Sequence, residues 1–151
     1  LLKKFNIMEI IYQRCLFFCQ SKSHCTDLFA SIKKELGDKM YVTPNGEPQD
    51  DRTSIVGMYH HGTGEEQKET AIDSFTSWDE MPMKLLFCTS SFVLGVNVSS
   101  CHYVIHLGPP NQLDQLIQEI GQVSRDGIPG HPILIQLASS LKGPGYEEQT
   151  K

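Results

Sequence analysis

The chain has 151 residues, 39% of them hydrophobic and 21% charged, a balance typical of one globular domain with its own core. Its formal net charge is −5, with 13 Lys and Arg against 18 Asp and Glu, which argues against strong autonomous binding to nucleic acid. No apolar run approaches the roughly 20 residues of a membrane span, and the first residues do not resemble a secretory signal. Since the first residue is Leu rather than Met, we expect a segment of a longer product.

Short apolar runs alternate with amphipathic stretches, a pattern that predicts a single α/β domain with a parallel sheet flanked by helices. In chain order we expect a strand (Arg14–Cys19), a helix (Lys22–Leu36), a loop (Thr43–Thr53), a strand (Ser54–Tyr59), a helix (Thr63–Phe75), a turn (Trp78–Pro82), two strands (Met83–Cys88 and Tyr103–Leu107), a helix (Gln112–Gly121) and a strand (Pro132–Leu137). A lead-in at residues 1–13 and a polar tail at 139–151 would leave 14–138 as the domain.

The expected helices have recognisable ends. Ser21 or Ser23 is expected to cap the first helix, and Gly37 to end it. Thr63 is expected to cap the second, with Glu66 in a capping box. The third helix has apolar side chains at helical spacing, at Leu113, Leu116, Ile117 and Ile120.

The cysteines are five, an odd number, and most of them lie within apolar runs. We therefore expect buried thiols in a reducing compartment rather than a disulfide framework. Cys15, Cys19 and Cys25 lack the paired C-x2-C spacing of zinc sites, so no metal site is predicted.

Polar clusters follow three of the expected strands, where ligands of open α/β sheets bind. They are Gln20-Ser21-Lys22, Thr89-Ser90-Ser91 and Gly108-Pro109-Pro110. Hydroxyl and backbone N–H groups suit an anion such as phosphate. A capping role for Ser90 or Ser91 is the alternative, and the sequence leaves both open.

Five segments together resemble one family. Residues 118–127 read Q-E-I-G-Q-V-S-R-D-G and resemble motif VI of RecQ-like superfamily 2 helicases, Q-E-x-G-R-A-G-R-D-G. Upstream, Leu16–Lys22 resembles motif IV, Met58–Gly62 a Tyr-His-Ala-Gly-like stretch, Leu85–Asn97 motif V, and His106–Pro110 the family's H-x-G-P-P segment. These segments keep the family's order and spacing from about Arg14 to Leu137.

The resemblance implies a RecA-like domain of the P-loop NTPase type, the C-terminal lobe of a 3′-to-5′ DNA helicase driven by ATP. Arg125 stands at the second arginine position of motif VI and is the arginine-finger candidate, whereas the first position holds Gln122. The resemblance also implies an ATP interface and a DNA-binding set. The ATP interface comprises Gln118, Gly121, Gly95 and Asn97, and the DNA-binding set comprises Gln20, Ser21, Lys22, His60, Thr89 and Ser90.

The sequence contains neither G-x-x-x-x-G-K-[ST] nor D-E-x-H, the motifs that hold ATP phosphates and Mg²⁺ in the first lobe. ATP and Mg²⁺ would therefore be bound mainly by a separate first lobe, and this chain alone is not expected to hydrolyse ATP. The implied partners are that lobe and single-stranded or forked DNA, with no membrane. The implied location is the nucleus, with the cytoplasm as the alternative.

Three residues depart from the family's motifs. Gln122 lacks the charge of an arginine, Ser124 replaces a Gly of motif VI, and Val93 replaces a Gly of motif V and is expected to stiffen its loop. An inactive helicase-like binding module and a gene relic therefore stay open as alternatives. Whether the chain takes part in ATP hydrolysis is also left open by the sequence. A surface salt bridge from Arg125 to Asp126 or Glu119, and a solvated turn at His60, are the plain alternatives for those residues.

Overall fold

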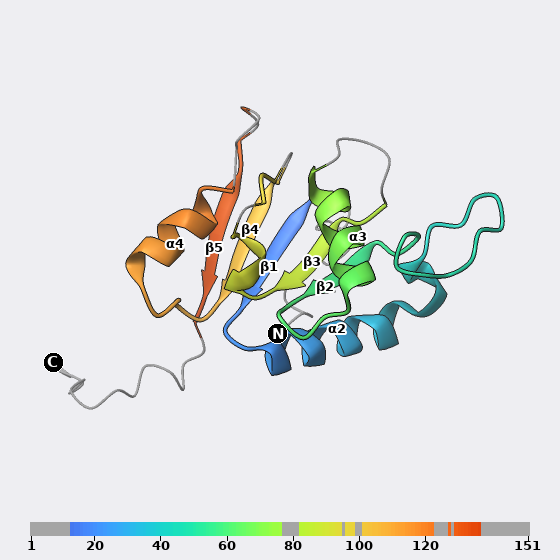
Figure 1. Cartoon of the computed structure of the whole chain (residues 1–151), viewed down its shortest axis with the longest axis horizontal. Helices are drawn as coiled ribbons and strands as arrows, with labels where there is room; N and C mark the ends of the chain where they lie inside the picture. The colour runs from blue at the N-terminus through green and yellow to red at the C-terminus, as the bar shows by residue number, and fades with distance from the viewer. Residues whose placement is uncertain are drawn as a thin grey trace, which may run out of the picture.

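A five-stranded parallel sheet forms the centre of the computed structural model, which describes residues 13–76, 82–94, 96–98, 101–122, 127 and 129–136 (Figure 1). The strands lie in the order β2-β3-β1-β4-β5. In chain order the elements are β1 (Cys15–Cys19), α2 (Lys22–Leu36), the 3-10 helix η2 (Gly37–Met40), β2 (Val56–Tyr59), α3 (Glu65–Thr76), β3 (Leu85–Cys88), the 3-10 helix η3 (Ser90–Phe92), β4 (Tyr103–Leu107), α4 (Leu113–Ile120) and β5 (His131–Ile135). The predicted α/β class and parallel sheet are confirmed.

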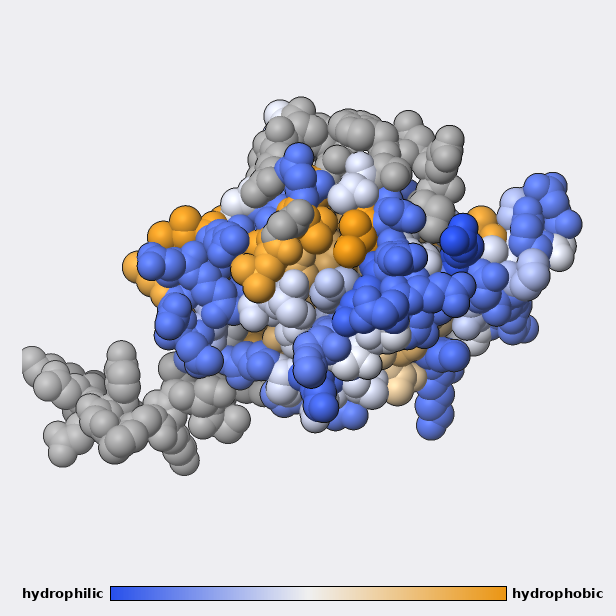
Figure 2. Space-filling view, viewed as in Figure 1, coloured by the Kyte–Doolittle hydropathy of each residue, from blue (hydrophilic) through white to orange (hydrophobic). Residues whose placement is uncertain are grey.

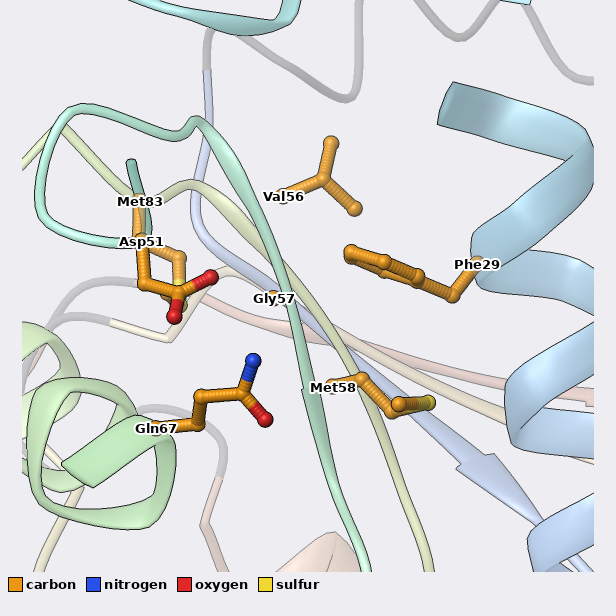
Figure 3. Close-up of a pocket in the computed structure, with 7 residues that line it drawn as sticks. All are labelled: Phe29, Asp51, Val56, Gly57, Met58, Gln67 and Met83. Atoms are coloured by element: carbon orange, nitrogen blue, oxygen red, sulfur yellow. The ribbon is translucent and has the colours of Figure 1, made fainter. Parts of the chain in front are cut away.

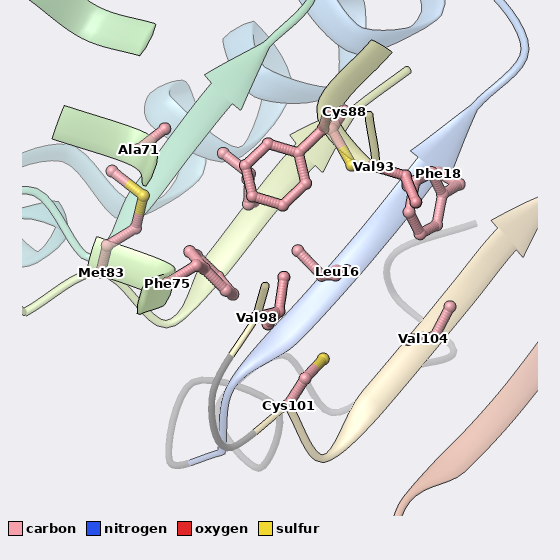
Figure 4. Packing of buried hydrophobic residues seen from close by; sticks show 12 residues of the cluster. Leu16, Phe18, Ala71, Phe75, Met83, Cys88, Val93, Val98, Cys101 and Val104 are labelled. Atoms are coloured by element: carbon pink, nitrogen blue, oxygen red, sulfur yellow. The ribbon is translucent and has the colours of Figure 1, made fainter. Parts of the chain in front are cut away.

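Strand β1 builds the core on both faces of the sheet. Its five residues are all buried, and successive side chains point to opposite faces. Leu16 and Phe18 enter the cluster that contains Phe75 of α3 and Phe92 of η3 (Figure 4). Cys15, Phe17 and Cys19 enter the second cluster with Cys25 and Ile32 of α2. Helices α2 and α3 therefore cover opposite faces, and a continuous apolar run is what a strand buried on both faces requires.

Strand β1 starts one residue later than the sequence predicted, and β2 and β3 each start two residues later. β2 begins at Val56 because Ser54 has another role: its hydroxyl donates to the Val56 carbonyl at 2.6 Å, and Ser54 pairs with Tyr41 in an isolated antiparallel bridge. β3 begins at Leu85 rather than Met83. The loop at 43–53 is confirmed, whereas the turn predicted at Trp78–Pro82 lies outside the described residues except for Pro82.

The ends of α2 are as predicted, but the cap of α3 is not. Ser21 Oγ accepts a hydrogen bond from the His24 N–H at 3.2 Å, and Gly37 ends α2 with φ 52°. Thr63 does not cap α3, because its hydroxyl accepts from the His60 N–H at 3.0 Å and closes the turn after β2. Helix α3 begins at Glu65, and the Gly64 carbonyl just before it accepts a hydrogen bond from the Lys68 N–H at 3.0 Å. Among the described helices, none has the length and apolar character needed to cross a bilayer.

Helix α4 has the predicted bounds to within one residue, and of its four predicted apolar positions Leu116 and Ile120 are half-buried. Leu113 and Ile117 are 70% and 61% exposed, whereas Glu119 on the same helix is 2% exposed. Periodicity showed which residues share a side of the helix, but it could not show which side faces the sheet. The buried carboxylate has a partner on β4, and that partner decides the orientation.

A small cavity lies at the outer edge of the sheet, beside β2 (Figure 3). Phe29 from α2 and Gln67 from α3 reach it from either side of Gly57. Its volume is about 30 Å³, roughly the share of one water molecule in the liquid. This cavity is too small for a nucleotide or a cofactor, so the candidate site is sought at the carboxyl ends of the strands.

The five cysteines are all buried, as predicted from their positions. Burial raises the pKa of the Cys15 and Cys88 thiols. We expect a thiol-reactive disulfide reagent to label the cysteines of the native chain on the order of a hundredfold more slowly than those of the same chain in guanidinium chloride. The reason is that reaction with a buried thiol must wait for local opening of the fold. A thiol that reacts at the denatured rate under native conditions would contradict this burial.

Candidate functional site

The loops that follow β1, β2 and β3 meet at one edge of the sheet. Parallel register sets this, since Phe18 and Tyr59 both pair with Cys88, the last residue of β3. The predicted DNA-contact residues lie directly after these strand ends, at Gln20, Ser21, Lys22, His60, Thr89 and Ser90. Segments about 70 residues apart in the sequence are thereby brought together, as the carboxyl-end rule for open sheets requires.

The start of α2 presents a positive end at this edge. Ser21 is its N-cap and the exposed Lys22 its first residue, so the helix dipole and the ammonium group favour the same kind of ligand, an anion. Gln20 has a structural contact instead: its Nε2 donates to the Pro109 carbonyl at 2.8 Å. The Gln20 side chain also occupies the space where a Cβ of Gly108 (φ 81°) would lie, at 2.6 Å, so this loop needs glycine.

His60 is the group at this edge with the least usual environment. It is 7% exposed, and its Nδ1 accepts from the Gly62 N–H at 3.0 Å, which leaves the proton of the neutral ring on Nε2. That Nε2 is buried and has no hydrogen-bond partner among the described residues. Burial lowers the pKa of His60, and the nearby charges of Lys22, His61 and Lys68 lower it further. The edge therefore offers a buried N–H donor near the positive charges of Lys22 and Lys68, the second of which is paired with Glu65 at 3.0 Å. The solvated turn considered above does not describe His60.

The lowered pKa of His60 predicts a pH dependence of stability. The unfolded chain takes up this proton near the ordinary value of 6.5, before the folded chain does. The contribution of His60 to the free energy of unfolding is therefore fully present above about pH 6.5 and is lost as the pH falls toward the folded pKa. NMR titration of the ring protons should give a pKa below 6.5, and His60→Asn should remove this share of the pH dependence. A folded pKa at or above the denatured value would contradict it.

The loop after β3 is anchored by its first residue. The Thr89 N–H donates to the Tyr59 carbonyl at 3.1 Å, and its hydroxyl lies 2.9 Å from Ser91 Oγ. Ser90 begins η3 and is exposed. Val93 has φ −74° and is 5% exposed within the core cluster (Figure 4), so its replacement of the family's Gly causes no backbone strain. Asn97 is exposed, and Gly95 lies outside the described residues.

The segment that resembles motif VI begins on α4. Gln118 and Gly121 are exposed, and Gly121 has φ −62°, which any residue adopts. Gln122 is turned inward: it is 2% exposed, and its Oε1 has no hydrogen-bond partner among the described residues. An arginine that contacts a nucleotide from this position would have to leave the protein interior. Arg125 and Ser124 lie outside the described residues.

A cavity of about 270 Å³ separates α4 from η3. Ser90 lies on one side, and Gln115 and Gln118 lie on the other. Its described lining also contains the acids Asp114 and Glu119 but no Lys or Arg, so a polyphosphate bound here would need its positive charge from elsewhere. In the described part of the chain, no three His, Cys, Asp or Glu side chains are grouped so that they could together hold a metal ion.

A polar pair that the sequence did not single out lies beside this cavity. His106 Nε2 of β4 is 2.7 Å from Glu119 Oε2 of α4, and both side chains are 3% exposed. Glu119 Oε1 accepts from Gln115 Nε2 at 2.9 Å. Glu119 is therefore not the surface partner considered above for Arg125. The available signal was a histidine inside the apolar run Y-V-I-H-L, since a buried polar side chain needs a partner.

Comparisons with known proteins place these features in one family. A family model described as "Helicase conserved C-terminal domain" matches residues 2–127. The chain is 23% identical over 124 residues to "ATP-dependent DNA helicase hus2/rqh1" of Schizosaccharomyces pombe, covering 82% of this chain and 8% of that protein. It is 25% identical over 130 residues to "ATP-dependent RNA helicase HAS1" of Mycosarcoma maydis, covering 82% of this chain and 22% of that protein.

Solved structures of helicase domains have a similar fold. The solved structure "Mss116p DEAD-box helicase domain 2 bound to an RNA duplex" superimposes with a TM-score of 0.67 at 18% identity, covering 93% of this chain and 48% of that one. At this identity the likeness shows the fold alone, which is that of a RecA-like helicase domain. The chain spans less than a quarter of the length of the two curated relatives above.

Proposed function

Because the chain belongs to the helicase conserved C-terminal domain family, as a superfamily 2 helicase C-terminal lobe, we propose that it is the second lobe of a RecQ-like 3′-to-5′ DNA helicase. Joined to a first lobe, it would supply motifs IV, V and VI for ATP-coupled unwinding. The ordered motif series and the similarity to a DNA helicase of S. pombe support the RecQ-like assignment. Relatives named as RNA helicases make RNA the competing ligand to be tested.

The observation that carries the nucleic-acid part is the unpartnered Nε2–H of His60 beside the N-terminus of α2. A phosphate oxygen would be attracted by Lys22 and by the helix dipole. The Nε2–H of His60 is buried, so it would donate to that oxygen only after its side chain turns outward. Ser90 and Thr89 lie at the end of the neighbouring strand, where a second phosphate of the same backbone would pass. All these contacts would be to the sugar-phosphate backbone of the nucleic acid, so they would give affinity without discriminating between base sequences.

The nucleic-acid proposal predicts a specific salt effect. Lys22→Ala should weaken binding of the chain to single-stranded DNA equally for all base sequences, and reduce the slope of log K against log salt by about 0.7, as the loss of one phosphate contact does. Fluorescence anisotropy at low ionic strength measures this. Lys34→Ala removes the same charge from the last turn of α2 and should leave the slope unchanged. Equal slopes for both variants would rule out Lys22 as a phosphate contact, and the same titration with RNA decides between the ligands.

The nucleotide part rests on Arg125, the remaining arginine of motif VI. Arginine at this position stabilises charge on the transferring phosphoryl group, so its removal acts on kcat. In a protein that joins this chain to a first lobe, Arg125→Ala should lower DNA-stimulated ATP hydrolysis by about a thousandfold. An unchanged rate would remove Arg125 from the mechanism. The chain alone should show no ATP hydrolysis.

A second candidate function is a binding module without turnover. The inward side chain of Gln122 and the absence of Lys or Arg among the described residues lining the α4 cavity favour it. Gln122→Arg together with Ser124→Gly restores the family's residues. A two-lobe protein that gains activity on restoration would have lost turnover through motif VI, whereas one that stays inert both before and after would have lost it elsewhere.

A further inference from the structure

The most buried side chain of helix α4 is polar rather than apolar. Two of its apolar residues, Leu113 and Ile117, are mostly exposed, and apolar surface lies over the α4 end of the molecule (Figure 2). The residue of α4 that is buried is Glu119. A buried carboxylate is costly unless its oxygens have partners, so this residue constrains how the helix lies.

Both oxygens of Glu119 are engaged. Oε2 lies 2.7 Å from His106 Nε2, and Oε1 accepts from Gln115 one turn earlier on α4 at 2.9 Å. The ring of His106 is fixed in turn, because it stacks on Phe18 with centroids 5.2 Å apart and planes 15° apart. β4 pairs with β1 on one side and β5 on the other, so the His106 backbone cannot shift. The contact thus joins a side chain fixed by the sheet to one on the helix.

The rotation of α4 about its axis follows from this contact. Each residue turns the helix by about 100°, so fixing Glu119 also fixes its neighbour Gln118. Gln115, Gln118 and Glu119 form the α4 side of the cavity that faces Ser90. We propose that His106 and Glu119 are positioning residues that set the rotation of α4, and thereby the placement of Gln118 on this cavity and of Gly121 at the end of the helix. The statement that Gln118 and Gly121 face a nucleotide rests on the proposed function. The placement of these residues by the His106–Glu119 pair is independent of it.

Amide hydrogen exchange of the full 151-residue chain, followed by NMR, tests this. In Glu119→Ala we expect the amides of α4 and of Gly121 to exchange at least about tenfold faster, with β1 and β3 unchanged within about twofold, because only the helix loses its attachment. Glu119→Gln has the same shape and still hydrogen-bonds, so it should restore exchange to within about threefold and return the Gln118 and Gly121 amide shifts. Glu69→Gln removes an exposed carboxylate from α3 and serves as the control for the loss of a negative charge, with no change expected in α4.

Three results would overturn the proposal: unchanged α4 exchange in Glu119→Ala, no restoration by Glu119→Gln, or equal loss of protection in α4, β1 and β3. The last would mean that the pair supports the whole fold rather than placing one helix. Should Glu119→Ala not fold, Gln115→Ala removes one donor only and should still speed exchange of α4, with no change being the contrary result. No nucleotide or nucleic acid is present, so failure here is distinct from failure of the helicase proposal, which would appear in the ATPase and DNA-binding measurements.

Discussion

The backbone pairing of β1 between β3 and β4 is the constraint on which the other features depend. Its register aligns Phe18 with Cys88 and Cys19 with Leu107, so these three strands end at one edge. The same strand supplies alternate side chains to the cores on both faces. A slip of one residue would exchange these faces and move every loop at the edge. The candidate site is therefore fixed by a ladder of main-chain hydrogen bonds inside the protein, at a distance from the groups that would contact a ligand.

Local charge at this edge differs from the charge of the whole chain. The chain carries a net charge of −5, yet Lys22, His61 and Lys68 lie close enough to His60 to lower its pKa. The N-terminus of α2 adds its partial positive charge at the same place. An acidic protein can in this way present a positive edge to an anion, while the rest of its surface limits nonspecific association.

Two departures from the family's motifs, at Val93 and at Gln122, differ in what they cost the folded protein. Val93 replaces a small residue in motif V, and the fold accommodates it, with an ordinary φ of −74° and a place in the core. Gln122 replaces an arginine in motif VI and is buried with an oxygen that lacks a partner among the described residues. The first replacement costs little, because an apolar side chain gains by burial. The second removes a charge that phosphoryl transfer uses and leaves a polar atom in the interior.

Apolar periodicity and turn residues were sufficient to predict the α/β class, the three helices and five strands that the structure describes, and the Ser21 and Gly37 ends of α2. The motif series also identified the loops that meet at the carboxyl edge. These features are local, since a run of apolar residues or a capping hydroxyl acts within a few positions of the chain.

The partners of polar side chains were decided by tertiary structure. Thr63 has the sequence of a cap but bonds His60, and α4 turns Glu119 rather than Ile117 toward the sheet. In the second case the reason is His106, 13 residues away in sequence and 2.7 Å away in space. The sequence by itself determined which segments form strands and helices, because those choices rest on local apolar patterns and backbone preferences. Only the tertiary structure decided which buried polar groups meet, because a hydrogen bond or an ion pair depends on distances that a linear pattern does not contain.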